Sequence, residues 1–169
     1  MFPVFVIDVL HAHQVQQWID AQLDTRGEQE IRRLAQLWDD AREGRRLIYV
    51  SWRDGVYAGH VTLVHQSEYA SFRYRKIPEI VDLWVQPAFR REGVATHLLM
   101  RLEDDMRASG QTALGLGVGV TDAFTPAQRL YARWGFAPDG NGMWHEGKRF
   151  DYHNADSVDD VVMMWEKTL

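Results

Sequence analysis

Residues 79–110 of the chain are EIVDLWVQPAFRREGVATHLLMRLEDDMRASG, and this stretch decides the fold. Its first seven residues form an apolar, β-branched run that Pro87 ends, which predicts a strand over Glu79–Val85. Apolar residues then recur at helical spacing, which predicts a helix over Gly93–Ser109. The stretch is therefore a strand, a loop with two arginines and one glycine, and a helix.

The loop before the predicted helix is a candidate anion site. A helix begins with unpaired backbone N–H groups and the positive end of its dipole, and a glycine there lets a ligand approach the backbone. Gly93, preceded by Arg90 and Arg91, therefore predicts a phosphate or pyrophosphate site. The alternative is that Gly93 only eases the turn and that both arginines are solvated.

Two common nucleotide motifs are absent from the sequence. No glycine-rich loop ends in Lys-Ser or Lys-Thr. The glycines at 115, 117 and 119 lie within a predicted strand and do not form GxGxxG. A nucleotide triphosphatase and a Rossmann-type oxidoreductase are therefore poorly supported.

The rest of the chain alternates strands and helices after an opening meander. Strands are predicted over 2–10, 47–52, 56–64, 112–120 and 161–165, and helices over 11–23, 28–42 and 125–134. Asp54-Gly55 lies between two apolar runs and predicts a hairpin, whereas 66–78 and 138–157 lack a clear pattern. The order predicts one α/β domain over 1–169, with a mixed sheet and helices on both faces.

Composition narrows the class of protein. The chain of 169 residues is long enough for one domain with a sizeable core. No apolar run reaches the roughly 20 residues of a membrane span, and the N-terminus lacks a basic leader, so we expect a cytoplasmic protein without a membrane partner. Cysteine is absent, which excludes disulfides, thiolate metal sites and a cysteine nucleophile.

The net charge and the histidine spacing limit the classes of ligand that the protein is expected to bind. Nineteen basic and 24 acidic residues give a formal charge of -5, which argues against nucleic acid and suits an amine partner. The seven histidines show no metal-ligand spacing, so no metal is expected. His97 falls in the first turn of the predicted helix, where it is a candidate to line a phosphate pocket.

Two segments carry a resemblance to a known family. The run Arg90-Arg91-Glu92-Gly93-Val94-Ala95 has the form Gln/Arg-x-x-Gly-x-Gly/Ala and follows an acidic strand start and Leu-x-Val-x-Pro. In these features the chain resembles the GNAT (Gcn5-related) N-acetyltransferases. A second run, TPAQRLYARWGF at 125–136, repeats the family's spacing with Ala127, Leu130, Tyr131, Gly135 and Phe136. Position 124, where the family often has Asn, is Phe124.

The resemblance implies a fold, a substrate and an activity. The implied fold is a single domain whose sheet is V-splayed between two central parallel strands. The pyrophosphate of acetyl-CoA would lie on backbone N–H groups at the start of the helix, and its pantetheine arm would pair with the preceding strand. The implied cofactor-binding residues are Leu83, Val85, Arg90, Arg91, Gly93, Val94, Ala95 and Thr96. The implied reaction moves acetyl directly from acetyl-CoA to a primary amine of a small molecule or protein.

The resemblance also implies catalytic residues. Tyr131 matches the family's tyrosine, which protonates the leaving thiolate. Main-chain N–H near Val85 would donate to the oxyanion. Glu79, eleven residues before Arg90, matches the base of the histone-acetyltransferase branch. Asp82 is the alternative base on the same strand, although alternation sends it to the opposite face, and solvent is the third option.

Two local expectations accompany these assignments. Thr125 is expected to be the N-cap of the second motif's helix, with Gln128 completing a capping box and Gly135 at the C-terminal cap. The alternating glycines of 112–120 leave one bare strand face, which admits either a close ligand or tight packing by another element.

Two other functions remain compatible with the sequence. One is a catalytically silent acyl-CoA-binding module that acts as a sensor or interaction domain, which Phe124 and the unsettled base keep open. The other is a dimerising structural domain without a ligand, which the Arg-x-x-Gly-x-Ala loop disfavours. The identity of the acceptor and the oligomeric state, including a homodimer, stay open at this point.

Overall fold

The computed structural model describes residues 5–151, 153 and 157–169. The chain forms two compact units, one from Met1–His65 and Val81–Ser109 and the other from Gln66–Ile80 and Gly110–Leu169. Strand β4, Glu79–Val85, begins in the second unit and ends in the first. The units are interleaved along the chain, and a single N-acetyltransferase domain over 1–169 stays a prediction.

The first unit contains an antiparallel meander. Strands β1 (Val6–Val9), β2 (Arg46–Arg53) and β3 (Val56–Val64) pair in chain order, and β4 follows β3. Asp54 and Gly55, with φ of 51° and 78°, form the left-handed two-residue turn between β2 and β3. The predicted hairpin is therefore confirmed.

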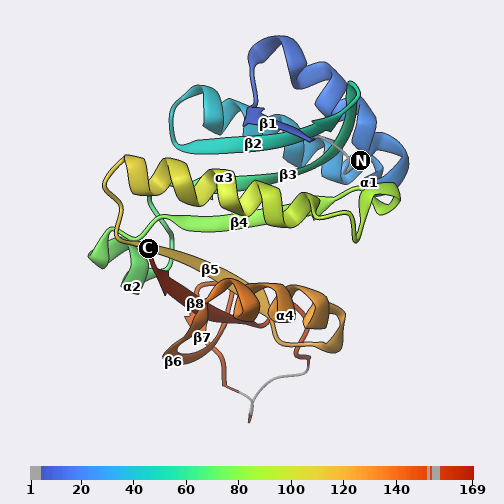
Figure 1. The fold of residues 1–169 in the computed structure, drawn as a ribbon. Helices are drawn as coiled ribbons and strands as arrows, with labels where there is room; N and C mark the ends of the chain where they lie inside the picture. Colours follow the sequence, from blue (N-terminus) through green and yellow to red (C-terminus); the bar gives the residue numbers. More distant parts are fainter. Residues whose placement is uncertain (1–4, 152, 154–156) are drawn as a thin grey trace. The chain divides into compact units, whose positions relative to one another are not determined.

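Two helices cover opposite faces of this meander, α1 (Val15–Arg42) and α3 (Val94–Ala108) (Figure 1). Helix α1 bends at Gly27, which has non-helical φ and ψ of 75° and 168°, in agreement with the two helices predicted over 11–23 and 28–42. The buried core on the α1 side consists of Leu10, Trp18, Leu34, Leu37, Ile48, Val50, Trp52 and Tyr57. The prediction of helices on both faces of a sheet is confirmed for this unit.

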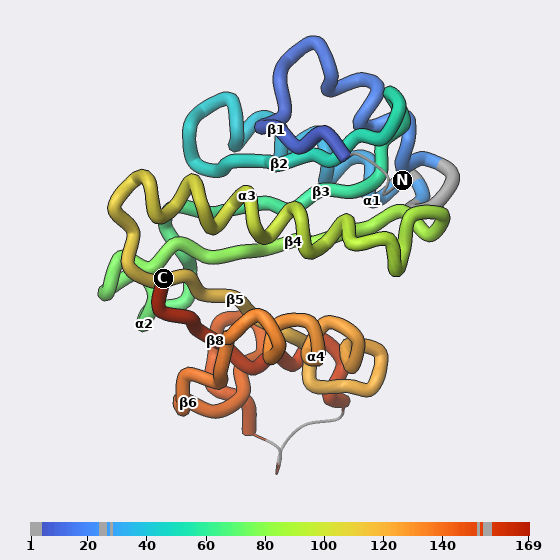
Figure 2. Tube along the Cα trace, viewed as in Figure 1, coloured from blue at the N-terminus to red at the C-terminus, as the bar shows by residue number. Residues whose placement is uncertain are grey.

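The second unit carries the parallel pairing that makes the sheet mixed. Its strands lie in the order β5, β8, β6, β7, with bounds Ala113–Gly119, Val162–Thr168, Ala137–His145 and Lys148–Arg149. Glu79 and Ile80 of β4 pair in parallel with Gly115 and Leu116, whereas β5 and β8 are antiparallel. Figure 2 follows the chain from β5 through α4 to the last strand, β8. The predicted mixed α/β fold is confirmed.

Two segments without a sequence pattern contain regular structure. The segment 66–78 includes a short helix, α2 (Ala70–Arg75), whose Phe72 is fully buried. The segment 138–157 contributes most of β6 and all of β7. Residues 152 and 154–156 of this segment, and residues 2–4 of the predicted first strand, lie outside the described residues.

Helix α4 (Thr125–Trp134) corrects the expected N-terminal cap. Its N-cap is Phe124 and no side-chain hydrogen bond caps it, because Thr125 already has helical φ and ψ of -51° and -42°. The short helix Asp122–Phe124 leads directly into α4, so no capping box forms. The Gln128 side chain instead donates to the Gly119 carbonyl at 2.7 Å. The C-terminal cap at Gly135, with φ of 95°, is confirmed.

Aromatic rings cover the bare face of β5. A Cβ atom added at Gly115 would overlap the ring of Phe72, and one added at Gly119 would overlap the ring of Phe124. At Gly117 the nearest atom would be the Met164 sulfur at 3.3 Å. Tight packing therefore accounts for the absence of a side chain at two of the three positions.

These contacts predict different effects for two substitutions in one strand. Gly115→Ala should lower the free energy of unfolding by about 2 kcal/mol, because the buried Phe72 ring must move to admit a methyl group. Gly117→Ala should change it by less than about 1 kcal/mol, since the Met164 side chain is flexible. Urea unfolding of both variants measures the difference, and equal losses would contradict the packing of Phe72 on Gly115.

Candidate functional site

The loop between β4 and α3 has the conformation that the anion-site hypothesis requires. Gly93 is the N-cap of α3 and has φ of 89°, in the left-handed region that glycine adopts without strain. The helix continues for 15 residues from Val94, so its first N–H groups and its dipole point toward the loop. A Cβ at Gly93 would meet only the His97 ring, at 3.5 Å. The N–H groups from Arg91 to Thr96 are the candidate pyrophosphate donors.

The two arginines of the motif differ in their contacts. Arg90 donates from Nε to the Val85 carbonyl at 3.2 Å, and its guanidinium lies 5.2 Å from the Trp84 ring centre. Arg91 is exposed and has a left-handed φ of 68°. Arg90 is thus anchored against β4, whereas Arg91 projects into solvent.

A third arginine, which no motif indicated, lies beside this loop. Arg53 forms an ion pair with Glu92, and its guanidinium lies 5.6 Å from the Phe89 ring centre. It also lies 6.0 Å from the Phe5 ring centre, and Phe5 contacts the ring of His97. The hairpin end of β2 therefore places Arg53 next to the start of α3, where Glu92 balances its charge.

The strand before the loop is irregular. Asp82 has φ of 53°, a left-handed conformation that interrupts regular alternation along β4. Leu83 and Val85, the candidate partners of a pantetheine arm, are half-buried and follow this irregularity. On the neighbouring strand a Cβ at Gly59 would lie 2.6 Å from the Trp84 carbonyl oxygen, so β3 and β4 approach closely only because position 59 is glycine.

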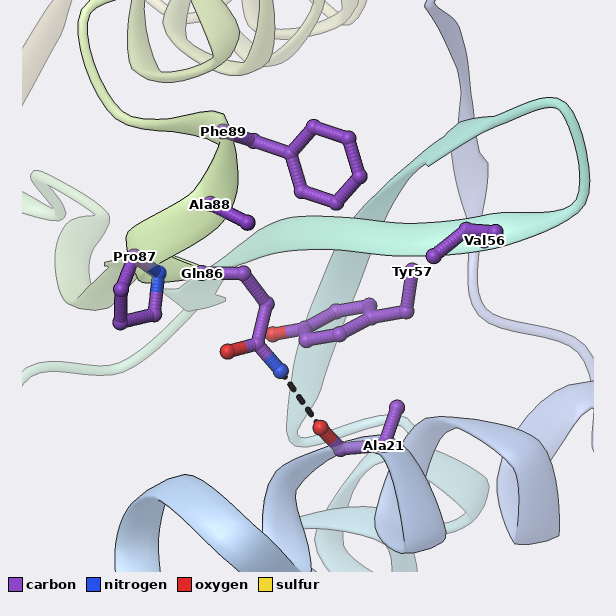
Figure 3. Close-up of a pocket in the computed structure, with 7 residues that line it drawn as sticks. All are labelled: Ala21, Val56, Tyr57, Gln86, Pro87, Ala88 and Phe89. Atoms are coloured by element: carbon purple, nitrogen blue, oxygen red, sulfur yellow. Dashed lines mark hydrogen bonds between the residues drawn. The ribbon is translucent and has the colours of Figure 1, made fainter.

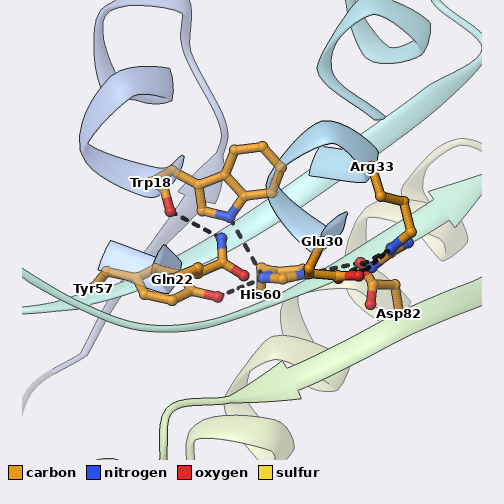
Figure 4. A network of polar contacts seen from close by, with 7 residues as sticks. All are labelled: Trp18, Gln22, Glu30, Arg33, Tyr57, His60 and Asp82. Atoms are coloured by element: carbon orange, nitrogen blue, oxygen red, sulfur yellow. Dashed lines mark hydrogen bonds and ion pairs between the residues drawn. The ribbon is translucent and has the colours of Figure 1, made fainter. Parts of the chain in front are cut away.

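The irregularity at Asp82 is held by a buried polar network (Figure 4). His60 is fully buried, and its Nε2 lies 2.9 Å from Oδ2 of Asp82. Its Nδ1 contacts both the Tyr57 hydroxyl and Nε1 of Trp18, which lies 3.4 Å away. Because an indole N–H can only donate, Nδ1 is the acceptor, so Nε2 carries the proton and donates to Asp82.

An arginine from α1 completes the network. Arg33 contacts Asp82 at 2.8 Å and Glu30 at 2.6 Å. Burial alone would raise the pKa of Asp82, but the His60 hydrogen bond and the Arg33 charge outweigh burial and hold that pKa well below its usual range. Asp82 is therefore a firmly ionised carboxylate, which makes it a weak proton acceptor. Strand alternation was expected to place Asp82 on the opposite face from Glu79, but the left-handed conformation of Asp82 interrupts that alternation.

The predicted catalytic residues Glu79 and Tyr131 belong to the second unit. Burial raises the pKa of Glu79, against the opposing effect of the Ser67 hydroxyl, which donates to its carboxylate at 2.6 Å. Tyr131 lies on α4 with 8% of its surface exposed, and its ring packs edge-on against Phe136. The roles of both residues stay predictions.

Neither a metal-ligand cluster nor a membrane-spanning helix occurs among the described residues. No three His, Asp or Glu side chains in that part of the chain are placed to hold a metal ion. Within the same residues no helix is long and apolar enough to cross a membrane.

The opposite pKa shifts of Glu79 and Asp82 predict opposite stability effects. Asp82→Asn should lower the free energy of unfolding by about 3 kcal/mol at pH 7, because Arg33 and His60 lose their buried partner. A carboxylate whose pKa is lower in the folded state than in the unfolded state, where it is near 3.9, stabilises the folded protein at higher pH. The difference between the variant and the wild type should therefore shrink as the pH falls below about 4.

Glu79→Gln is the matched comparison. A raised folded pKa destabilises the ionised form, so this variant should equal or exceed the wild-type stability at pH 7 and lose that advantage as the pH falls to 4. Urea unfolding between pH 3 and pH 8 measures both curves. If the difference in unfolding free energy from the wild type changes with pH in the same direction for both variants, the environments assigned to Asp82 and Glu79 are contradicted.

Known proteins resemble this chain in sequence and in fold. An IAA acetyltransferase from Azospirillum brasilense is 42% identical over 62 residues, which are 37% of this chain and 39% of that protein. A Desulfovibrio desulfuricans protein assigned to the GNAT acetyltransferases shares the fold with a TM-score of 0.74 at 14% identity, over 98% of this chain and 99% of that chain. The PaiA N-acetyltransferase from Thermoplasma acidophilum, solved with coenzyme A, has a TM-score of 0.64 at 14% identity, over 98% and 99% of the two chains.

The family model of the GNAT acetyltransferases matches residues 12–136. That range contains the loop from Arg90 to Ala95 and the helix that carries Tyr131. Because the match covers well over half of the chain, this protein belongs to the GNAT acetyltransferase family.

Proposed function

We propose that this protein transfers the acetyl group of acetyl-CoA directly to a primary amine of a small molecule or a protein. The observation that carries the proposal is the left-handed Gly93 at the start of α3, in the family's acyl-CoA motif. The coenzyme A complex of the Thermoplasma relative supports acyl-CoA as the donor. The first backbone N–H groups of α3, with the exposed Arg91 nearby, suit a pyrophosphate group.

The reaction needs no covalent enzyme intermediate. The amine loses a proton, its nitrogen attacks the thioester carbonyl, the C–N bond forms and the C–S bond breaks. The second proton leaves the nitrogen, and the thiolate takes up a proton to give the free thiol of coenzyme A. Net, acetyl-CoA and an amine become an amide and coenzyme A.

We assign three roles to residues of this chain. Leu83 and Val85 present main-chain groups to the pantetheine arm, with N–H near Val85 as the oxyanion donor. Glu79 accepts the amine proton directly or through water, which a pKa raised by burial makes more effective near neutral pH. Tyr131 donates a proton or hydrogen bond to the thiolate.

A silent acyl-CoA-binding module is the second candidate. It is favoured by one observation, the Phe124 ring that packs on Gly119 where the family often has Asn. Incubation with acetyl-CoA and mixed amines, followed by release of free thiol, separates the two functions. Thiol release that depends on an amine supports the transferase, whereas a thermal shift with coenzyme A and no turnover on any amine supports the binding module.

The anion site predicts the effect of two substitutions at Gly93. Gly93→Asn and Gly93→Val both place a side chain where phosphate would approach the backbone, so each should weaken coenzyme A binding at least tenfold, about 1.4 kcal/mol. Asparagine tolerates a left-handed φ better than valine, so only the valine variant should also lose considerable thermal stability. Calorimetry with coenzyme A tests this, and an unchanged affinity in Gly93→Asn would remove the anion site.

Two further variants test the proposed general acid, Tyr131, and the proposed general base, Glu79, independently. Tyr131→Phe should lower turnover by roughly 10²–10⁴ across the pH range, because only the hydroxyl is lost. Glu79→Gln should lower the rate at pH 7, flatten the rising acid limb of the pH–rate profile and regain activity at high pH, where the amine deprotonates in bulk water. A loss below threefold in Tyr131→Phe would make that residue a packing residue, and an unchanged limb in Glu79→Gln would make solvent the base.

A further inference from the structure

The end of β4 lies beyond the pairing of that strand with β5. The parallel pairing stops at Ile80, which is opposite Leu116, and within the part of the chain that the structure describes no later residue of β4 pairs with β5. The rest of the strand, from Val81, belongs to the first unit. One edge of its main chain therefore has no β5 partner and can pair with an extended ligand.

Contacts with β3 show which residues face that edge. The Gln86 N–H donates to a carbonyl of β3 at 2.9 Å, and the Trp84 carbonyl lies against Gly59 of the same strand. Because the main-chain groups of successive strand residues point to alternate sides, those of Leu83 and Val85 face away from β3. These are the two residues whose main chain the proposed function assigns to the pantetheine arm.

The direction of that edge is set by Asp82, which comes directly before Leu83. A left-handed residue other than glycine is unfavourable within a strand, so it persists only where its surroundings hold it. A return of Asp82 to extended backbone would restore regular alternation and turn the main chain that follows toward another side. His60 of β3 and Arg33 of α1 hold Asp82 in its conformation (Figure 4).

The other end of this segment is also held from α1 (Figure 3). Gln86 is buried, with 8% of its surface exposed, and its amide nitrogen donates to the Ala21 carbonyl. A groove of about 400 Å³ opens beside this contact, with Ala21, Tyr57 and Phe89 among its lining residues. The groove leaves space on one side of the Gln86 side chain, so the hydrogen bond rather than close packing fixes that side chain.

We propose that Arg33 and Gln86 are positioning residues for the pantetheine arm of acyl-CoA. Arg33 acts through Asp82 on one end of the segment Leu83–Val85, and Gln86 fixes the other end against α1. Hydrogen bonds to the arm depend on direction, so a rotated segment binds the arm weakly even when the pyrophosphate loop is intact. The inference rests on the proposed function and extends it to two side chains outside the acyl-CoA motif.

Two ligands that differ by the arm alone measure this effect. Dephospho-coenzyme A is ADP joined to pantetheine, so the Kd of ADP divided by the Kd of dephospho-coenzyme A reports the contribution of the arm. Arg33→Met and Gln86→Met each remove the tie to α1 or to Asp82 and keep an unbranched side chain. Each should lower this ratio about fivefold or more and leave the Kd of ADP unchanged. Calorimetry at a temperature at which each variant is folded gives both constants.

Matched variants separate positioning from a general effect of substitution. Arg33→Lys keeps a cation opposite Asp82 and should recover most of the ratio that Arg33→Met loses. Arg42→Met makes the same change in an exposed ion pair with Asp39 at the end of α1 and should leave the ratio unchanged. An equal loss in Arg42→Met would overturn the inference. If Arg33→Met does not fold, Gln86→Met decides the test.

The results distinguish this inference from the function on which it rests. A lower melting temperature with an unchanged ratio in the folded variants makes both side chains purely structural, which overturns the inference and leaves the transferase intact. Equal affinity of the wild type for both ligands, or binding of neither, also overturns the inference. If the ratio falls as expected and no amine releases thiol from acetyl-CoA, the inference holds and the transferase fails.

Discussion

The largely buried carboxylate of Asp82 is the constraint on which the first unit depends. A left-handed non-glycine residue in the middle of a strand is unfavourable by about 1 kcal/mol or more, so it persists only where its surroundings hold it. Here His60 and Arg33 supply a hydrogen bond and an ion pair. Because this one carboxylate joins His60 of β3 to Arg33 of α1, the polar contacts and the strand geometry are retained or lost together.

The same network ties both halves of α1 to the sheet. Trp18 precedes the bend at Gly27 and contacts His60, whereas Arg33 follows the bend and contacts Asp82. Gln86 adds a third tie through the Ala21 carbonyl. A helix interrupted by a glycine is thus fixed on either side of the interruption, which keeps the groove wall in a defined position relative to Tyr57.

Strong local signals made much of the fold predictable. The Asp-Gly turn, the apolar stripe of α3 and the cap at Gly135 each depend on neighbouring residues, and each was found where the sequence placed it. Helix α2 is only six residues long, which is too short to show a helical period. Its Phe72 packs on Gly115, a contact between distant parts of the sequence that no local pattern predicts. The predicted cap at Thr125 was wrong for a local reason, because the short helix Asp122–Phe124 leads directly into α4.

The candidate site likewise contains some features that the sequence predicted and others that it did not. The phosphate loop was visible because a helix start, a glycine and arginines are adjacent in sequence. Arg53, His60 and Arg33 were not assigned, because each acts on residues far along the chain. A lone histidine within the apolar strand 56–64 was the only hint of the network, and a buried histidine by itself does not reveal its partners.

The ring of Phe124 over Gly119 couples two positions of this chain. Any side chain at 119 would meet the ring where it now lies. A smaller residue at 124 would remove that obstacle, so position 119 can accept a side chain readily only when position 124 changes with it.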